Sequence, residues 1–265
     1  MNQTDTSATS HADRQVAVIT GAGSGIGLEA AKLLYNMDMA VVGVGRDPIK
    51  LEQLQAAIGD ADRLATIAAD ITDDDAPRAI IDLALRRFGR IDFLINNAGI
   101  GSPKPVHETD DDTLDRYLDL MLRAPFRLSR EAIAHMKAGS AIINVTSTFA
   151  VIGGRRGGAY SAAKGGLTAL TLHMACEYGP SGIRANCVAP GVTMTDMVRE
   201  RFNDKAFRRM NVETTPYPRL GEAEDIAGTI AFLCSPQGAF INGQTIVVDG
   251  GWSSTKYMSP ALINA

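Results

Sequence analysis

The stretch TGAGSGIG, Thr20 to Gly27, lies between the apolar run VAVIT, Val16 to Thr20, and the helical pattern GLEAAKLLYNM. Glycines 21, 25 and 27 allow a tight turn and let backbone N–H groups approach a phosphate. A helix that begins in this turn adds the positive end of its dipole. The position after a strand and before a helix favours a phosphate-binding loop over a tight turn without a ligand.

Six further apolar runs alternate with helical patterns along the chain. They are nearly continuous in apolar, β-branched residues, as strands buried on both faces are. This alternation predicts an α/β fold of the doubly wound type, in which helices cover both faces of a parallel sheet. Together with Val16–Thr20, the expected strands are Ala40–Val44, Leu64–Ala69, Asp92–Asn96, Ala141–Thr146, Ile183–Ala189 and Thr245–Asp249.

No linker or change in composition divides the 265 residues, so we expect a single domain over residues 15–252. Residues 1–14 are polar and predict a solvated, mobile arm. Residues 253–265 form a tail with Tyr257, Met258 and Leu262. We expect this tail to pack on the domain or on a neighbouring subunit.

The composition, 45% hydrophobic and 21% charged, is that of a globular protein. A net charge of −4 without a basic stripe argues against a nucleic-acid partner. No apolar run reaches the length of a membrane span, and the start lacks the order of a signal peptide. Three cysteines without motif spacing predict reduced thiols and a cytoplasmic protein. The four scattered histidines match no metal-ligand pattern, so we expect no metal site.

Ligands of such a sheet lie beyond the carboxyl ends of the strands. An acidic residue after the second strand would bond the adenosine ribose of NAD, but this chain has Gly45 followed by Arg46. A guanidinium suits a 2′-phosphate, which favours NADP(H). NAD(H) stays possible if Arg46 is a solvated charge and Asp47 serves the ribose. Asp70, after the third strand, either accepts from the adenine amine or caps the next helix.

The segment GGAYSAAKGG, Gly157 to Gly166, sets Tyr160 and Lys164 four residues apart among small residues. Residues at this spacing lie on one face of a helix, so the phenol and the ammonium are neighbours. They are either an ordinary surface pair or two parts of a reactive site.

Six motifs, in order, resemble those of the short-chain dehydrogenase/reductase family over roughly Gln15 to Trp252. They are TGAGSGIG, NNAG (Asn96 to Gly99), NVTS ending at Ser147, YSAAK, NCVAPGVTMT and VDGGW. The resemblance implies a Rossmann-type fold with seven parallel strands and a homotetramer. It also implies an enzyme that transfers a hydride between a nicotinamide cofactor and a small-molecule carbonyl or alcohol substrate.

The same resemblance implies which residues bind the cofactor. Residues 97–99 are expected at the adenosine ribose and pyrophosphate, and residues 190–192 at the nicotinamide. Thr195 is expected to bond the carboxamide, and Val192 to pack near the ring. The full set is Gly21, Ser24, Gly25, Ile26, Gly27, Arg46, Asp70, Ile71, Asn97, Ala98, Gly99, Tyr160, Lys164, Pro190, Gly191, Val192 and Thr195.

The resemblance makes Ser147, Tyr160 and Lys164 the catalytic residues. A phenol has an ordinary pKa of about 10 and is a weak base at neutral pH. A nearby ammonium and the positive ring of oxidised nicotinamide favour the phenolate and lower this pKa. We therefore expect Tyr160 to exchange a proton with the substrate oxygen, to which Ser147 donates a hydrogen bond. Lys164 also suits the hydroxyls of the nicotinamide ribose.

Two positions depart from the family pattern. Asp38 ends the first helix where the family has glycine, and aspartate tolerates the left-handed conformation better than most residues. Met121 stands where the family has the asparagine of a proton relay, and methionine is a very weak acceptor.

The relay water in the family is held largely by the backbone carbonyl at the position of Met121. We therefore expect an active enzyme, provided that the helix keeps a local distortion there. One alternative is a cofactor-binding member without catalysis, and another is an NAD-linked alcohol dehydrogenase.

The motifs leave the substrate open, because variable loops build its pocket in this family. These loops are residues 100–108, 149–158 and 196–218. Arg155 and Arg156 lie in the second loop, between Ser147 and Tyr160. We hypothesise that one of them meets an anionic or strongly polar substrate; the alternative is two solvated loop charges.

Overall fold

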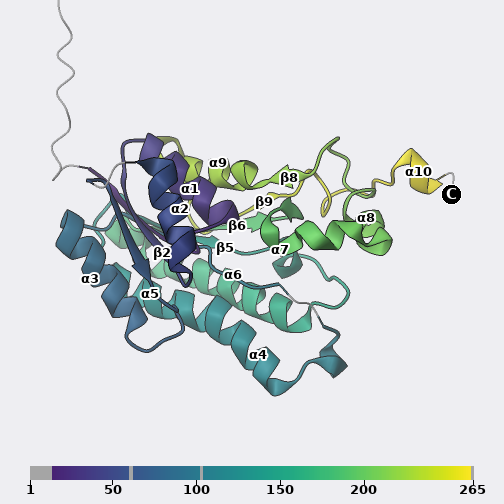
Figure 1. Ribbon diagram of the computed structural model, residues 1–265, viewed down its shortest axis with the longest axis horizontal. Helices are drawn as coiled ribbons and strands as arrows, with labels where there is room; N and C mark the ends of the chain where they lie inside the picture. Colours follow the sequence, from purple (N-terminus) through teal and green to yellow (C-terminus); the bar gives the residue numbers. More distant parts are fainter. Residues whose placement is uncertain (1–13, 60–61, 102–103, 264–265) are drawn as a thin grey trace, which may run out of the picture.

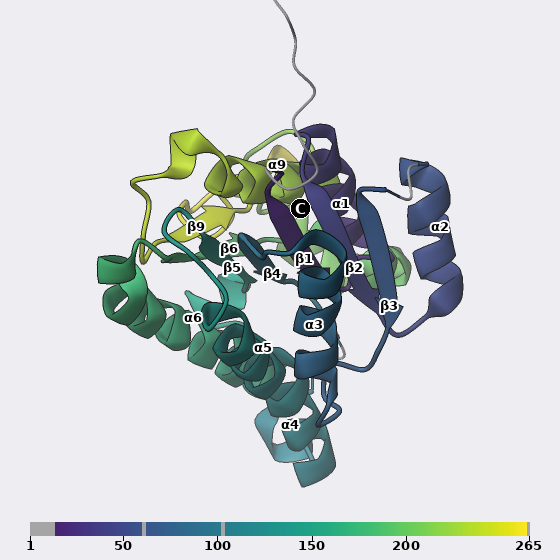
Figure 2. The ribbon, with the colours of Figure 1, turned by 90° about the vertical axis from the view of Figure 1, so that its left-hand side faces the viewer.

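The computed structural model describes residues 14–59, 62–101 and 104–263. Its main sheet lies between the helices (Figure 1) and has seven parallel strands in the order β3-β2-β1-β4-β5-β6-β9, which can be followed in Figure 2. Each strand matches the apolar run expected for it to within one residue at either end, which confirms the predicted α/β fold. The strands are β1 (Val16–Thr20), β2 (Ala40–Gly45), β3 (Leu64–Ala68), β4 (Phe93–Asn96), β5 (Ala141–Val145), β6 (Arg184–Pro190) and β9 (Thr245–Val248).

Helices cover both faces of this sheet. Figure 2 shows α1 and α9 on one face and α3, α5 and α6 on the other. A π-helical turn, η2 (Asp119–Arg123), joins α4 to α5. The helices are α1 (Gly25–Asn36), α2 (Pro48–Ile58), α3 (Ala76–Phe88), α4 (Asp111–Leu118), α5 (Ala124–Ile133), α6 (Gly158–Tyr178), α7 (Asp196–Arg199), α8 (Lys205–Asn211), α9 (Ala223–Cys234) and α10 (Pro260–Ile263). Short 3-10 turns are η1 (Val106–Glu108), η3 (Thr148–Ala150), η4 (Gly179–Ser181), η5 (Glu200–Asn203) and η6 (Pro236–Gly238).

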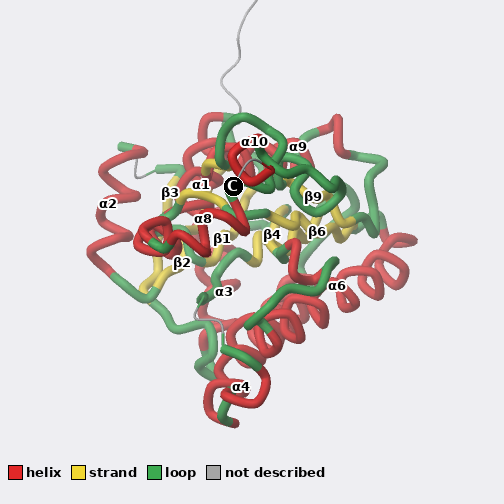
Figure 3. The backbone as a smooth tube through the Cα atoms, turned by 90° about the vertical axis from the view of Figure 1, so that its right-hand side faces the viewer, coloured by secondary structure: helices red, strands yellow, loops and turns green. Residues whose placement is uncertain are grey.

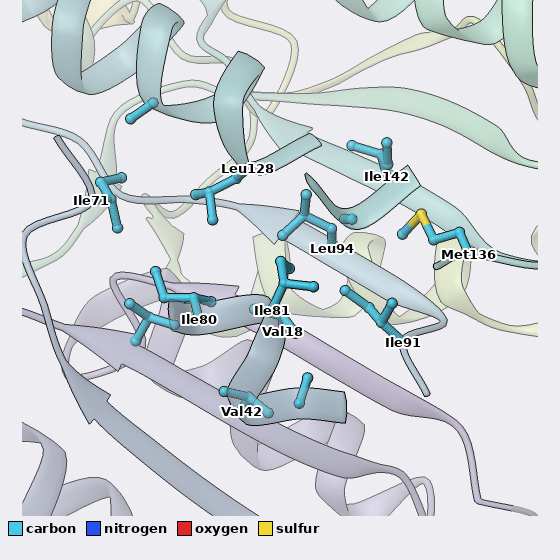
Figure 4. Packing of buried hydrophobic residues seen from close by; sticks show 14 of the residues in the cluster. Val18, Val42, Ile71, Ile80, Ile81, Ile91, Leu94, Leu128, Met136 and Ile142 are labelled. Carbon is cyan, nitrogen blue, oxygen red and sulfur yellow. The ribbon is translucent and has the colours of Figure 1, made fainter. Parts of the chain in front are cut away.

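The sheet separates two hydrophobic cores. Along β1, Val16 and Val18 pack into the core beneath α3, α5 and α6, while Ala17 and Ile19 pack into the core beneath α1 and α9. Figure 4 shows part of the first core, in which Ile80 of α3 lies near the central strands. Each fully buried aliphatic side chain stabilises the fold by about 1.5–3 kcal/mol. Burial on both faces explains why the strands lack polar alternation.

Asp38 follows α1 with a backbone φ of 66°, as expected for a residue that replaces a helix-ending glycine. Its carboxylate accepts from Arg14 at 2.9 Å and from Arg63 at 3.2 Å. Two ion pairs therefore hold a residue whose backbone conformation is uncommon for a non-glycine side chain.

A two-stranded parallel sheet of β7 (Thr193–Met194) and β8 (Gly221–Glu222) was not expected. Strands of two residues are too short to carry a period that a sequence pattern reveals. Their pairing closes a loop over residues 195–220 that carries α7 and α8. Figure 3 views the molecule from the end at which α8 and α10 lie.

The tail after the last strand contacts this closed loop. The indole Nε1 of Trp252 donates to the carbonyl of Met210, and the backbone N–H of Ser259 donates to the carbonyl of Glu213. The predicted N-terminal arm lies outside the described residues except for Arg14, and the predicted domain boundaries stay a prediction.

Candidate active site

A cavity of about 290 Å³ lies where β1, β4, β5 and β6 end. Most residues predicted from the motifs line it, so the fold brings together segments far apart in sequence. The predicted residues that line it are Gly21, Ser24, Gly25, Ile26, Asn97, Ala98, Gly99, Ser147, Tyr160, Lys164, Pro190, Gly191, Val192 and Thr195. Four predicted residues lie outside its lining: Gly27, Arg46, Asp70 and Ile71.

The glycine loop needs its glycines for two different reasons. Gly21 and Gly25 have φ values of 69° and 52°, a region that favours glycine. Gly27 has an ordinary φ, but a Cβ there would lie 2.2 Å from the carbonyl oxygen of Gly21. Gly27 therefore serves the close approach of α1 to the loop and does not line the cavity.

The N-terminus of α1 suits an anionic group. Ser24 occupies the N-cap position without a side-chain capping bond, and no acidic residue lies in the first turn. The first N–H groups of the helix are therefore not satisfied by a side chain, and Ser24, Gly25 and Ile26 line the cavity. These features fit the pyrophosphate of a dinucleotide, which the N–H groups of this turn would hold.

Thr20 ties the glycine loop to the segment after β4. Its Oγ1 accepts from the backbone N–H groups of Asn97 and Ala98, both at 3.0 Å. The Asn97 amide donates back to the carbonyl of Thr20 at 2.9 Å. Asn97 lines the cavity as predicted, but its Nδ2 holds the loop in place.

The end of β2 carries Arg46, whose side chain is 59% exposed and lies 3.6 Å from a carboxylate oxygen of Asp70. The other oxygen of Asp70 accepts from the N–H and the hydroxyl of Thr72. Partial burial raises the pKa of Asp70, but the bonds from Thr72 and the charge of Arg46 outweigh it and lower the pKa overall. Asp70 does not cap the next helix, because α3 begins only at Ala76.

Asp47, the alternative partner of the ribose, and Ile71, a predicted cofactor residue, both support the fold. Asp47 is the N-cap of α2, and its Oδ1 accepts from the N–H groups of Ile49 and Lys50. This engagement weakens the alternative in which Asp47 serves a ribose. Ile71 is 5% exposed and packs in the hydrophobic core.

Ser147, Tyr160 and Lys164 meet on one wall of the cavity. Ser147 follows β5, and the other two lie one turn apart on α6. The Ser147 hydroxyl accepts from the backbone N–H of Phe149 at 3.2 Å and lies close enough to the phenol of Tyr160 to affect its pKa. The ring of Tyr117 stands edge-on to the Tyr160 ring, with centroids 6.2 Å apart. The Lys164 ammonium is buried and donates to the carbonyl of Val145 at 2.7 Å.

The pKa shifts of this group correct one expectation. Burial raises the pKa of Tyr160, and the nearby Ser147 hydroxyl opposes this only in part. The net lowering expected from Lys164 and the oxidised nicotinamide is therefore not found in the protein without its cofactor. Burial also lowers the pKa of Lys164 to about 8.

Met121 is fully buried in the π-helical turn η2, close to Gly99. The helix thus keeps a local distortion at this position although the asparagine is absent, which is the condition set above for an active enzyme. Pro125 supplies a physical reason. Its missing N–H cannot bond to the carbonyl of Met121, four residues earlier, and its ring would clash with that carbonyl in a regular helix.

The segment after β6 lines the opposite wall. A Cβ on Gly191 would lie 2.6 Å from the side chain of Asp249, so this turn passes close to the end of β9. Thr195 is the N-cap of α7, yet its side chain makes no capping bond. Its hydroxyl is therefore available to a ligand, as its predicted bond to a carboxamide requires.

Comparisons with known proteins agree with this geometry. A family profile described as enoyl-(acyl carrier protein) reductase matches residues 21–253. The cis-4-hydroxycyclohexanecarboxylate dehydrogenase of Sinomonas cyclohexanicum is 38% identical over 91% of this chain and 97% of its own. A short-chain dehydrogenase/reductase of Brucella melitensis, described as a glucose/ribitol dehydrogenase, superposes with a TM-score of 0.86 at 36% identity, covering 90% and 96% of the two chains.

The chain belongs to the short-chain dehydrogenase/reductase family. A further member, the 3-ketoacyl-(acyl-carrier-protein) reductase of Brucella melitensis in complex with NADH, has a TM-score of 0.83 and 35% identity and covers 90% and 98% of the two chains. The protein is thus an NAD(P)-dependent oxidoreductase that acts on CH–OH groups.

Several residues of this short-chain dehydrogenase/reductase line the cavity without having been predicted. They are mostly large and apolar, and all but Trp252, the last residue of the VDGGW motif, lie outside the quoted motifs: Tyr117, Phe149, Met197, Arg201, Asn211 and Trp252. For four of them, Phe149, Met197, Arg201 and Asn211, the only clue was their position in loops 149–158 and 196–218. Phe149 and Trp252 lie with ring centroids 6.1 Å apart.

Arg155 and Arg156 are exposed and do not line the cavity. The structure therefore gives no support to the hypothesis that one of them meets the substrate. Among the described residues there is no group of three or more potential metal ligands. Nor does that part of the chain contain a helix that is long and apolar enough to cross a bilayer.

Proposed function

We propose that the protein is an NADP(H)-linked oxidoreductase that interconverts a secondary alcohol and a ketone, with Tyr160 as the general acid/base. The observation that carries the proposal is the meeting of Ser147, Tyr160 and Lys164 on the same cavity as the glycine loop. When bound, the nicotinamide supplies or accepts the hydride at the substrate carbon.

The side chains of the site handle the proton and the charge on the substrate oxygen. In reduction, Tyr160 Oη gives its proton to the carbonyl oxygen, and in oxidation the phenolate takes the hydroxyl proton. Ser147 donates a hydrogen bond to the same oxygen and stabilises its negative charge.

Two features support NADP(H). The Arg46 guanidinium is mostly exposed at the end of β2, and its pairing with Asp70, at 3.6 Å, is loose. Asp47 is occupied as a helix cap. The second candidate is an NAD(H)-linked enzyme, which the 3-ketoacyl-(acyl-carrier-protein) reductase bound to NADH favours, since it is 35% identical.

A homotetramer is part of the proposal. Large apolar side chains are exposed on α5 (Phe126), α6 (Leu172) and the edge strand β9 (Val247). Such side chains on neighbouring elements are typical of subunit interfaces. Light scattering tests this assignment, and a monomer in solution would contradict it.

The activity itself is tested with both reduced cofactors and a panel of ketones. One relative is named for a ring alcohol that carries a carboxylate, so oxocyclohexanecarboxylate belongs in the panel. Tyr160→Phe should lower kcat by about 10³-fold, since general acid–base catalysis contributes 10²–10⁴-fold. Cofactor binding, measured by fluorescence titration, should stay unchanged. Wild-type turnover in the Tyr160→Phe variant would refute the assignment of Tyr160.

A further inference from the structure

The cavity has two cationic side chains among its described lining residues, and one of them has no assigned role. Lys164 donates to the carbonyl of Val145 beside Tyr160. Arg201, in the 3-10 turn η5, lines the same cavity from the loop between β7 and β8. The chain has a net charge of −4, so a cation at this position is not a consequence of overall composition.

No described carboxylate lies within 4.0 Å of the Arg201 guanidinium. Instead, the guanidinium carbon lies 4.4 Å from the centroid of the Phe207 ring. Phe207 is itself buried and stands edge-on to Phe202 at 5.3 Å. A guanidinium that rests on an aromatic face keeps its N–H donors at its edge. Arg201 is therefore positioned by an aromatic ring while its hydrogen-bonding capacity stays available.

Asp196 is the acidic group on the cavity lining, and its charge is partly compensated. Its carboxylate lies 3.6 Å from the guanidinium of Arg199. Residues 196–212 as a whole carry five basic and three acidic side chains. Of these charged side chains, only Asp196 and Arg201 line the cavity, and Asp196 is paired with Arg199. Arg201 is therefore the cation on this wall that is left to meet an anionic ligand.

The lining near Arg201 is apolar, with Phe149, Met197 and Trp252 contributing large side chains. We infer that Arg201 binds a carboxylate of the substrate, so that the substrate is a hydroxy or oxo acid with an apolar body. The inference rests on the proposed function, in which Ser147 and Tyr160 hold the reacting oxygen. Arg201 would then hold the opposite end of the same molecule, as a residue that determines specificity.

The test compares oxocyclohexanecarboxylate with its methyl ester, which has the same ring without the charge. In Arg201→Gln, kcat/KM for the acid should fall by about 10- to 100-fold, as expected for the loss of a charge-assisted hydrogen bond. The value for the ester should change by less than about threefold, because the ester makes no ion pair. Arg201→Lys should recover part of the loss. Arg209→Gln is the matched control, since Arg209 is exposed on α8 and does not line the cavity.

The outcomes distinguish failure of the role assigned to Arg201 from failure of the proposed oxidoreductase function. Equal losses for acid and ester, or no preference for the acid in the wild type, would overturn the role of Arg201 and leave the oxidoreductase function intact. If neither ketone is turned over, the proposed function fails for this substrate class. Calorimetric titration of the acid into the protein with NADPH then tests Arg201 without catalysis. Equal affinity of wild type and Arg201→Gln would overturn the inference, and weaker binding by the variant would support it.

Discussion

The cavity has one wall formed mainly by backbone atoms and another formed mainly by side chains. The wall formed by the glycine loop and residues 97–99 consists largely of backbone, held by bonds such as those between Thr20 and Asn97. The wall formed by residues 196–212 and Trp252 consists of side chains such as Met197 and Arg201. Backbone geometry restricts which residues fit, whereas side chains on loops can vary freely. A cofactor shared by a whole family thus suits the first wall, and an individual substrate suits the second.

Of the changes that test this comparison of the two walls, a substitution in the glycine loop should have the largest effect. In Gly27→Ala, the new Cβ meets the carbonyl oxygen of Gly21 at 2.2 Å and the Asn97 amide at 2.6 Å, so the loop or α1 must shift. We expect kcat/KM for the cofactor to fall by about 100-fold and the free energy of unfolding by about 1–3 kcal/mol. Steady-state kinetics and thermal denaturation measure the two effects.

The control for this change is Gly228→Ala in α9. Apart from the backbone of its own helix and its chain neighbours, no atom lies within 4 Å of a Cβ at Gly228, which is exposed. Alanine should therefore stabilise the helix by about 0.5–1 kcal/mol and leave cofactor kinetics unchanged. Wild-type cofactor kinetics in Gly27→Ala would show that the close approach is not needed.

The next largest effect, on NADPH binding, concerns Arg46 at the end of β2. Arg46→Ala should weaken NADPH binding by about 10- to 100-fold, since a charge-assisted bond to a phosphate is lost. NADH, which has no 2′-phosphate, should be affected by less than about threefold. Fluorescence titration with both cofactors checks this. The NADP(H) assignment is wrong if the wild type binds both equally well.

Lys164 lies beside Gly99, next to Tyr160, and its charge predicts a pH dependence. Burial lowers its pKa to about 8, so it is an ammonium below this pH and neutral above it. The pKa of Tyr160 is raised, so the phenol stays protonated through the same range. We expect kcat/KM for ketone reduction to be constant below pH 8 and to fall above it, by up to about tenfold per pH unit.

This profile is measured at saturating NADPH between pH 6 and 10. Thermal denaturation over the same range separates titration of Lys164 from unfolding. A profile that stays level through pH 9 would contradict the assignment.

The two walls also differ in what the sequence alone reveals. All seven strands of the main sheet could be predicted, because burial on both faces leaves continuous apolar runs. Ser147, Tyr160, Lys164 and the glycines could be predicted because their chemistry tolerates few residue types. Arg201 could not, since its position depends on the packing of its guanidinium against Phe207 and on the pairing of β7 with β8.

The smallest expected effect on turnover concerns Met121. Its side chain packs in the hydrophobic core, whereas its backbone carbonyl is the group expected to hold the relay water. The π-helical turn at this position persists with methionine, and Pro125 accounts for the freed carbonyl without any side-chain bond. Met121→Asn should therefore change kcat by less than about tenfold, equivalent to about 1.4 kcal/mol in the barrier. It should also lower stability by about 1–3 kcal/mol, because an amide replaces a thioether in an apolar environment. Met121→Leu, which conserves volume and polarity, should leave both quantities close to wild type. An inactive wild type together with a gain of activity in Met121→Asn would contradict this prediction. The asparagine side chain, and not the Met121 carbonyl that Pro125 leaves free, would then complete the relay.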